Sequence, residues 1–202
     1  MRTRPMVSVG TAILLSTLVT TQAGRAEDDT TGNLIVNGSF EEGPEVKRYL
    51  PLNLGSAAIK GWVVTRGQID YLGPLHWKAA VGSRSIDLNG SPGFGGIKQS
   101  FATTKGRKYK VRFTMAGTPI SYGGDGGVKI LCVRAADKKE AFSADATASV
   151  GRDIGWTKKT WEFSATGANT TLEFYSLDFD DPKCGPALDD VSVVEVKEKD
   201  GK

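Results

Sequence analysis

Short runs in which apolar and polar residues alternate, separated by glycine-rich turns, limit most strongly how this chain can fold. Between residues 108 and 115, charged or polar residues alternate with Tyr109, Val111, Phe113 and Met115. Successive side chains of a β-strand point to opposite faces, so this run predicts a strand with one face in a core and the other in water. Similar short strands are expected at residues 34–36, 59–64, 68–72, 84–88, 128–134, 158–165, 171–177 and 187–194.

The segments between these runs predict turns and loops rather than helices. Residues 45–56 contain Pro51, which cannot donate a hydrogen bond within a central strand, and they are expected to form a loop over the domain. Residues 135–148 include Asp137, Lys138 and Lys139 and are expected to form an exposed turn. With 25 glycines and turn signals throughout, the chain predicts an all-β fold, a β-sandwich, in a single domain over residues 33–196.

The first 26 residues have the pattern of a secretory signal peptide. Arg2 and Arg4 precede an apolar run over residues 6–19, and small residues follow at Ala23 and Ala26. The run is shorter than the ~20 residues of a membrane-spanning helix, so we expect an exported protein with no transmembrane segment. Residues 27–32 are expected to be a flexible leader and residues 197–202 a disordered tail.

Removing the signal peptide changes the charge balance of the chain. The 26 basic residues include Arg2, Arg4 and Arg25 within the first 26 positions, where there is no acidic residue. The rest of the chain therefore carries as many basic as acidic residues. This balance lacks the basic excess that is typical of nucleic-acid-binding proteins, so nucleic acid is not an expected partner. We expect the protein to be a monomer.

The two cysteines, Cys132 and Cys184, predict one disulfide, because an exported chain meets oxidising conditions. The bridge would close a loop of roughly 50 residues and stabilise the fold by ~4 kcal/mol in the chain-entropy model. The alternative, a metal-binding or catalytic thiol, lacks the Cys-x-x-Cys or Cys/His spacing of such sites.

Four segments, taken in order, resemble a known family. They are Asn-Leu-Ile-Val-Asn-Gly-Ser-Phe-Glu-Glu at 33–42, Gly-Ser-Arg-Ser-Ile-Asp-Leu-Asn-Gly at 82–90, Tyr-Lys-Val-Arg-Phe-Thr-Met-Ala-Gly at 109–117 and Cys-Gly-Pro-Ala-Leu-Asp-Asp-Val at 184–191. The set is similar to the choice-of-anchor C family of bacterial surface proteins and to the related plant cell-wall proteins of domain of unknown function 642. The resemblance covers residues 33–194 and implies a galactose-binding-like jelly roll, similar to calcium-containing carbohydrate-binding modules, in an extracellular or cell-wall setting. The chain departs from the plant proteins, which carry two such domains, and its tail shows no anchor.

The same resemblance implies a structural calcium. In those modules a carboxylate after the Asn-Gly-x-Phe turn and the first Asp of the Leu-Asp-Asp-Val strand help to hold the ion. The matching residues are Glu41 and Asp189, with Asp190 as a neighbour. Calcium takes about six to eight oxygen ligands in flexible geometry, which a turn and a strand from opposite ends of the chain can supply. The alternative is that these acids are solvated or paired with Lys or Arg.

Aromatic residues beside the loop-rich segments are the expected ligand contacts, because sugar-binding β-sandwiches stack aromatic faces on pyranose rings. The residues expected to bind a ligand are Trp77, Tyr122, His76 and Tyr71. Each has an alternative as a core or loop-supporting residue, and Trp62 is expected in the core. The glycine-rich segments 90–96 and 123–127 are expected to be flexible rim loops, since neither is followed by the Lys-Ser/Thr and helix of a phosphate loop.

The sequence shows no catalytic constellation. His76 is the single histidine, and the chain has no Gly-x-Ser-x-Gly elbow for a hydrolase triad. A glycosidase needs two carboxylates, but nothing marks a pair among Asp70, Asp178, Asp180 and Asp181. We therefore expect a secreted or cell-surface, non-catalytic module that binds a cell-wall or matrix polysaccharide. The alternative is a structural or protein-interaction module of the cell envelope with no glycan ligand.

Overall fold

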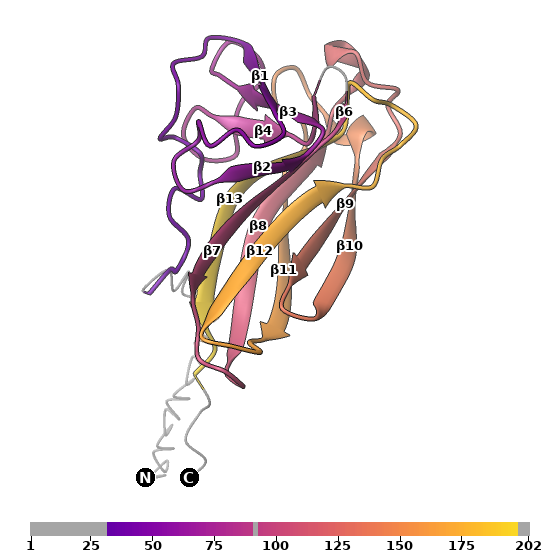
Figure 1. Cartoon of the computed structure of the whole chain (residues 1–202). Coiled ribbons are helices and arrows are strands. Elements are labelled where there is room, and N and C mark those ends of the chain that lie inside the picture. The colour runs from indigo at the N-terminus through magenta and orange to yellow at the C-terminus, as the bar shows by residue number, and fades with distance from the viewer. Residues whose placement is uncertain (1–31, 91–92, 198–202) are drawn as a thin grey trace, which may run out of the picture.

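The computed structural model describes residues 32–90 and 93–197, which form a sandwich of two antiparallel β-sheets (Figure 1). The six-stranded sheet has the order β1 (Tyr49–Asn53), β3 (Gln68–Leu72), β4 (Ser85–Asp87), β13 (Pro186–Glu195), β8 (Lys108–Gly117), β11 (Thr157–Ser164). The five-stranded sheet has the order β10 (Lys138–Asp145), β9 (Val128–Ala135), β12 (Asn169–Ser176), β7 (Gly96–Ala102), β2 (Val63–Arg66). The shorter elements are the ladder of β5 (Asn89–Gly90) with β6 (Gly93–Phe94) and the 3-10 turns η1 (Ile120–Tyr122) and η2 (Ala146–Ala148). The expected all-β jelly-roll sandwich is confirmed.

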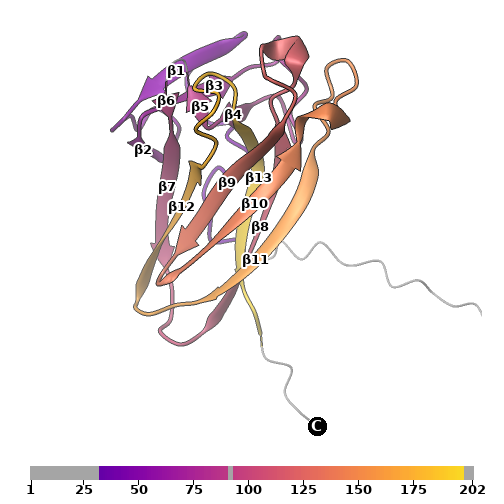
Figure 2. The ribbon, with the colours of Figure 1, turned by 90° about the vertical axis from the view of Figure 1, so that its right-hand side faces the viewer.

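The core lies between the two sheets, which Figure 2 shows as layers. Strand β8 illustrates how the sequence pattern builds this core, because its alternate residues Tyr109, Val111, Phe113 and Met115 are all buried. Apolar side chains from β9, β12 and β7 cover them from the other sheet. The strand expected at residues 68–72 is β3 itself, and those expected at 84–88, 108–115, 128–134, 158–165, 171–177 and 187–194 coincide with β4, β8, β9, β11, β12 and β13 to within a few residues.

The two ends of the described chain lie side by side. Residues 34–36 do not form an assigned strand, but the Leu34 N–H donates to the Val193 carbonyl oxygen at 2.8 Å. The Val191 N–H donates to the Gly38 carbonyl oxygen at 2.9 Å. A Cβ on Gly38 would lie 1.8 Å from the Val191 carbonyl oxygen, so only glycine allows this approach. The first segment therefore closes the domain against β13.

Two strands lie where the sequence predicted a loop and a turn. The chain does turn at residues 136–137, but most of the predicted turn is strand β10, and both strands were missed for the same reason. β1 and β10 are edge strands, each hydrogen-bonded to one neighbour. Pro51 is tolerated in β1 because an edge strand leaves some of its N–H groups without a ladder partner. The exposed charges at the start of β10, which resemble a turn in the sequence, protect an edge strand against pairing with another chain. β7 was also not expected, because glycines precede it.

The predicted signal peptide and most of the predicted leader and tail lie outside the described residues. Among the described residues, no helix has the length and apolar character to cross a membrane.

The predicted disulfide is wrong, because Cys132 and Cys184 are both free and buried. Cys132 lies in β9 on the outer face of the five-stranded sheet, where it pairs in register with Tyr175. Cys184 lies in the loop before β13, where its thiol donates weakly to the Tyr122 carbonyl oxygen at 3.8 Å. Burial, with the charges of nearby aspartates, raises the pKa of the Cys184 thiol to about 12. A rule based on cysteine count cannot detect that the two residues belong to different parts of the fold.

We predict that the purified, unreduced protein titrates two thiols with a thiol reagent after denaturation, as expected for two free cysteines. Before denaturation, reaction should be slow, because both side chains are buried and the high pKa of Cys184 leaves little thiolate. Recovery of both thiols only after treatment with a reductant would contradict this assignment.

Candidate functional site: a cavity at the end of the sandwich

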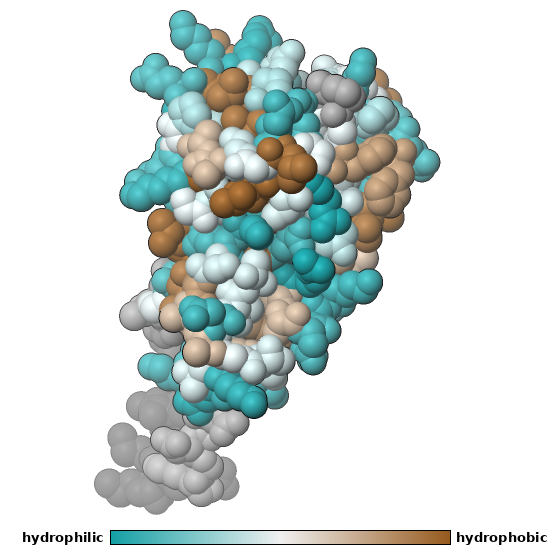
Figure 3. All heavy atoms as spheres, in the orientation of Figure 1, coloured by the Kyte–Doolittle hydropathy of each residue, from teal (hydrophilic) through white to brown (hydrophobic). Residues whose placement is uncertain are grey.

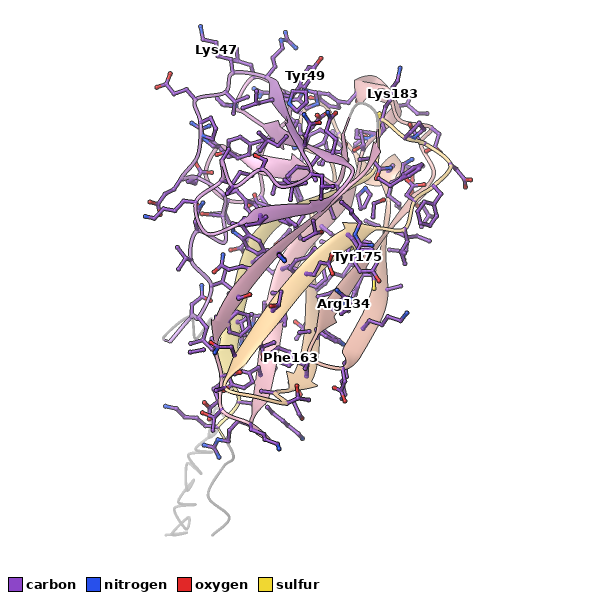
Figure 4. All side chains as sticks on the ribbon, viewed as in Figure 1. Lys47, Tyr49, Arg134, Phe163, Tyr175 and Lys183 are labelled. Atoms are coloured by element: carbon purple, nitrogen blue, oxygen red, sulfur yellow. The ribbon has the colours of Figure 1, made fainter. Side chains whose placement is uncertain are left out.

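A cavity of about 260 Å³, which we call the apical cavity, opens at one end of the sandwich. It lies at the upper end in Figure 1, where Tyr49 and Lys183 are labelled in Figure 4. Strands β1, β3 and β4, the turn η1 and the loop of residues 177–185 contribute to it. Its lining residues are Tyr49, Asp70, Leu72, His76, Asp87, Thr118, Tyr122, Gly123, Asp181, Lys183 and Cys184.

One wall of the apical cavity is aromatic. The His76 ring lies between Tyr49 and Tyr122, with centroid separations of 6.1 and 4.9 Å. The Tyr122 hydroxyl donates to the His76 carbonyl oxygen at 3.1 Å, which fixes η1 against the loop that follows β3. Tyr49 is 52% exposed, so its ring is available to a ligand. The structure thus brings His76 and Tyr122 together, as the sequence interpretation requires, and adds Tyr49.

Two of the aromatic residues predicted to contact a ligand are core residues instead. Trp77 is 2% exposed and packs behind the wall, with its ring centroid 4.8 Å from that of His76 and 5.6 Å from that of Tyr122. Tyr71 is fully buried, and its hydroxyl donates to the Phe40 carbonyl oxygen at 2.6 Å. Neither residue lines the apical cavity. Trp77 therefore supports the aromatic wall, and Tyr71 fastens the first turn of the domain.

The opposite side of the apical cavity is acidic. Asp70 of β3 and Asp87 of β4 are register partners, so their side chains lie on the same face of the sheet. Both are buried and both line the cavity. Asp87 accepts hydrogen bonds from the backbone N–H groups of Asn89 and Gly185, at 2.9 and 3.0 Å, and from the Thr118 hydroxyl at 2.7 Å. Asp87 thereby holds three segments of the chain around the cavity.

Burial and charge set the protonation of this site. Burial raises the pKa of Asp87 to about 7, and the neighbouring charge of Asp70 acts in the same direction against the lowering effect of its hydrogen bonds. Burial also lowers the pKa of His76, assisted by the positive charges of Arg48 and Arg152. His76 is therefore a neutral ring at pH 7, and the cavity pairs an uncharged aromatic wall with a carboxylate side rich in hydrogen-bond acceptors.

A buried lysine joins two loops that form the mouth of the apical cavity. Lys129 of β9 has a side chain that is 1% exposed, and its Nζ lies 3.0 Å from Asp125, 3.0 Å from Asp178 and 3.7 Å from Asp181. Burial alone would lower the pKa of Lys129, but the hydrogen bonds and charges of Asp178 and Asp125 outweigh it and raise the pKa. The ammonium group therefore links the glycine-rich loop 123–127 to the loop 177–185.

The residues predicted to hold calcium lie elsewhere, around the loop before β4. Glu41 accepts hydrogen bonds from the N–H groups of Ser83 and Arg84, both at 2.8 Å, and from the Ser83 hydroxyl at 2.9 Å. Asp189 is fully buried and accepts from the Val81 N–H at 3.0 Å. The first and last segments of the domain thus converge on one loop, as expected, but they do so through hydrogen bonds.

The fit of these acids to a calcium ion is poor. Their oxygens already accept N–H and O–H groups, and Asp190, which is partly exposed, lies at a bulge of β13 with its N–H donated to Asp189. Within residues 32–90 and 93–197 there is no group of three or more His, Cys, Asp or Glu side chains that could hold a metal ion. The arrangement favours closure by hydrogen bonds, and calcium binding at Glu41 and Asp189 stays a prediction.

Sequence reasoning missed several lining residues of the apical cavity. Tyr49 lay in the segment interpreted as a loop, and Thr118 and Lys183 carry no motif. Asp70 and Asp87 had a detectable signal, because each is a carboxylate between two apolar residues of a short strand, where a buried acid is costly without hydrogen-bond partners.

Comparison with known proteins identifies relatives of this chain. Residues 33–194 match the family model described as "Protein of unknown function (DUF642)". Halomucin of Haloquadratum walsbyi is 34% identical over 170 residues, which are 81% of this chain and 2% of halomucin. The Arabidopsis thaliana protein named DUF642 L-GALACTONO-1,4-LACTONE-RESPONSIVE GENE 1 is 27% identical over 179 residues, which are 81% of this chain and 46% of that protein. The chain thus spans less than half the length of either relative.

A solved structure shares the fold. The arabinose-bound α-L-arabinofuranosidase MgGH51 aligns with a TM-score of 0.52 and 12% identity, over 81% of this chain and 26% of that one. At this identity the likeness concerns the fold alone.

Melting with and without a chelator tests the calcium prediction. If Glu41 and Asp189 hold calcium, EDTA should lower the melting temperature of the wild type by several degrees, since removing a bound ion removes its contribution to the folded state. Asp189→Asn should abolish that sensitivity. Identical melting curves with EDTA and with added calcium would contradict calcium binding. The role of these carboxylates would then be to close the domain through hydrogen bonds.

The raised pKa of Asp87 predicts a dependence of stability on pH. Since its pKa is about 7 in the folded state and near 3.8 when unfolded, the folded state holds this proton more tightly. The associated stability is fully present below the unfolded pKa and is lost as the pH rises through 7, on the order of 2–4 kcal/mol.

Asp87→Asn should reduce this dependence, because an amide can accept the two N–H bonds and donate to the Thr118 hydroxyl. The free energy of unfolding, measured with urea between about pH 4 and pH 8 for the wild type and the variant, checks this prediction. Asp189, whose pKa burial also raises to about 7, keeps part of the slope in the variant. A variant with the same slope as the wild type would show that Asp87 is not responsible.

Proposed function

The chain belongs to the DUF642 family of proteins of unknown function, and we propose that it is a non-catalytic carbohydrate-binding module with its site in the apical cavity. The observation that carries the proposal is the pairing, in one cavity, of an aromatic wall with buried carboxylates. Pockets for small ligands combine apolar and aromatic surface with a few fixed polar groups. A sugar ring presents both matching features, a C–H face and a set of hydroxyl donors.

The aromatic wall supports stacking on a sugar ring. Tyr49 and Tyr122 flank the His76 ring, and the Tyr122–His76 hydrogen bond and the Trp77 ring behind them fix Tyr122 and His76. A preformed wall costs little conformational entropy when a ligand binds. Asp70 and Asp87 then accept hydrogen bonds from hydroxyl groups on the opposite edge of the ring.

The size and charge of the apical cavity define the sugar that it suits. A volume of about 260 Å³ is at the lower limit of ordinary ligand pockets, so the cavity suits one or two rings, such as the end of a chain. The carboxylates of Asp70 and Asp181, joined by Asp87 when it is ionised, repel a negatively charged sugar. We therefore assign a neutral sugar residue to this site.

A binding role agrees better with the geometry than a catalytic one. Asp87 is engaged by two backbone N–H groups and a hydroxyl, which makes it a structural acceptor rather than a free acid or base. The lowered pKa of His76 and its packing between two rings give it a place in the aromatic wall. Glycosidases instead place two carboxyl groups on either side of the bond that they cleave.

The proposal includes export of the protein from the cell. The signal-peptide pattern of residues 1–26 supports a secreted or cell-surface location. A glycan of the cell wall or extracellular matrix is then the accessible partner. The resemblance to choice-of-anchor C proteins adds a surface setting, with the means of attachment left open.

Glycan arrays and polysaccharide pull-down test this proposal. We expect the wild type to bind neutral glycans, and Tyr122→Ala and Asp70→Asn each to weaken binding about tenfold, as for residues at the centre of a binding site. Phe179→Ala, an aromatic residue that is 63% exposed and outside the cavity lining, serves as the matched control and should bind like the wild type. Absence of binding to every neutral glycan would instead favour a structural or protein-interaction module.

A further inference from the structure

The outer face of the five-stranded sheet carries a row of charged residues on four neighbouring strands. Register pairs join Lys139 of β10 to Arg134 of β9, Arg134 to Glu173 of β12, and Glu173 to Lys98 of β7. Paired residues in antiparallel strands share a face, so the four side chains lie on one side of the sheet. Lys98 pairs in turn with Val63 of β2, which completes the row across the sheet.

The neighbouring row adds a second arginine beside Glu173. Arg66 of β2 pairs with Gly96 of β7, which pairs with Tyr175 of β12. The Arg66 guanidinium stacks on the Tyr175 ring, 3.8 Å from its centroid. Because Gly96 has no side chain, Arg66 can reach across β7 to Tyr175 and Glu173. Figure 4 shows Tyr175 and Arg134 on this front face, and in Figure 3 hydrophilic residues cover much of the middle of the same face.

Glu173 holds both arginines in place. Its side chain is 5% exposed, and its carboxylate oxygens lie 2.6 Å from Arg66 Nη2 and 2.7 Å from Arg134 Nη2. The Thr65 hydroxyl donates a further bond at 2.8 Å. The arginine side chains remain 40% and 56% exposed, so each guanidinium keeps donors directed to solvent. Two guanidinium groups fixed in this way form a preorganised site for anions.

The charges of this face do not cancel. Lys98, Arg66, Arg134 and Lys139 oppose the buried carboxylate of Glu173, and the other acid on this face, Asp145, lies at the opposite end of β10 from Lys139. A chain whose basic and acidic residues balance beyond residue 26 thus has a segregated positive surface, which we call the basic row. Because the row crosses the strands, its charges repeat at roughly the 4.8 Å spacing of neighbouring strands.

We propose that the basic row binds an acidic polysaccharide, a glycan chain that carries carboxylate or sulfate groups, laid across the strands of the five-stranded sheet. An open sheet face gives an extended chain room to lie across the strands, and the spacing of the charges is close to the size of one sugar ring. Arginine pairs geometrically with carboxylate and sulfate oxygens. The Tyr175 ring is covered by Arg66, so this face lacks the free aromatic surface on which proteins stack nucleic-acid bases.

The basic row is separate from the apical cavity. None of its residues lines that cavity, where carboxylates disfavour an anionic ligand. The two sites would therefore take different sugars, a neutral residue at the end of the sandwich and an acidic chain on the sheet. The two proposals can fail independently, because variants of the apical cavity and variants of the basic row are tested on different glycans.

Retention of the purified protein on immobilised alginate, heparin and dextran tests the proposal. We expect salt-sensitive retention on alginate, which carries carboxylates, or on heparin, which also carries sulfates, and none on neutral dextran. Arg66→Gln/Arg134→Gln should weaken binding to the retaining polymer at least about tenfold, the typical weight of charge-assisted hydrogen bonds. Tyr122→Ala, in the apical cavity, should behave like the wild type.

Further variants separate this effect from misfolding and from net charge. Lys98→Gln/Lys139→Gln keeps the Glu173 bonds intact and should also elute at lower salt. Lys105→Gln/Lys158→Gln removes the same charge from exposed positions outside the basic row and should elute with the wild type. The proposal is overturned if the wild type is not retained at low salt, or if Lys105→Gln/Lys158→Gln lowers the eluting salt concentration as much as the row variants do. Binding of duplex DNA as tight as that of the polysaccharide would also overturn it.

Discussion

Buried and half-buried carboxylates that accept backbone N–H groups are the interaction on which this domain depends. Loops at the end of a sandwich have no ladder partner for their N–H groups, and such groups are costly to bury unpaired. Glu41 binds the loop before β4, Asp189 binds the same loop from β13, and Asp87 binds the segments on both sides of the apical cavity. Each charge is offset by several donors, so the loops and the cavity between them are held in fixed positions.

Alternation of side chains predicted the interior of the fold well and its edges badly. Strands such as β8 have a core face and a polar face, which the sequence displays directly. Edge strands have fewer constraints, so β1 could include Pro51 and β10 could begin with consecutive charges. The disulfide prediction was wrong for another reason. Composition suggests that Cys132 and Cys184 pair, but distance between them follows only from the three-dimensional arrangement.

The candidate site was predicted only in part, because it is assembled from short segments far apart in the chain. His76 and Tyr122 were predicted as aromatic residues beside loop-rich segments. The role of Asp87 follows only from the structure, in which β4 places it next to Asp70. The basic row was also not predicted, because composition gives total charge and not the position of each charge. A sum of charges takes no account of where folding places them, so the balanced composition beyond residue 26 concealed a positive sheet face.

Lys129 gives the mouth of the apical cavity its own permanent counterion. Many loop clusters of aspartates recruit a cation from their surroundings and rearrange when its concentration falls. Here the positive charge is covalently attached to β9 and sits among Asp125, Asp178 and Asp181 whatever the mineral content of the medium. The shape of this rim is thus encoded entirely in the polypeptide, and it is kept as the ionic conditions of the medium vary.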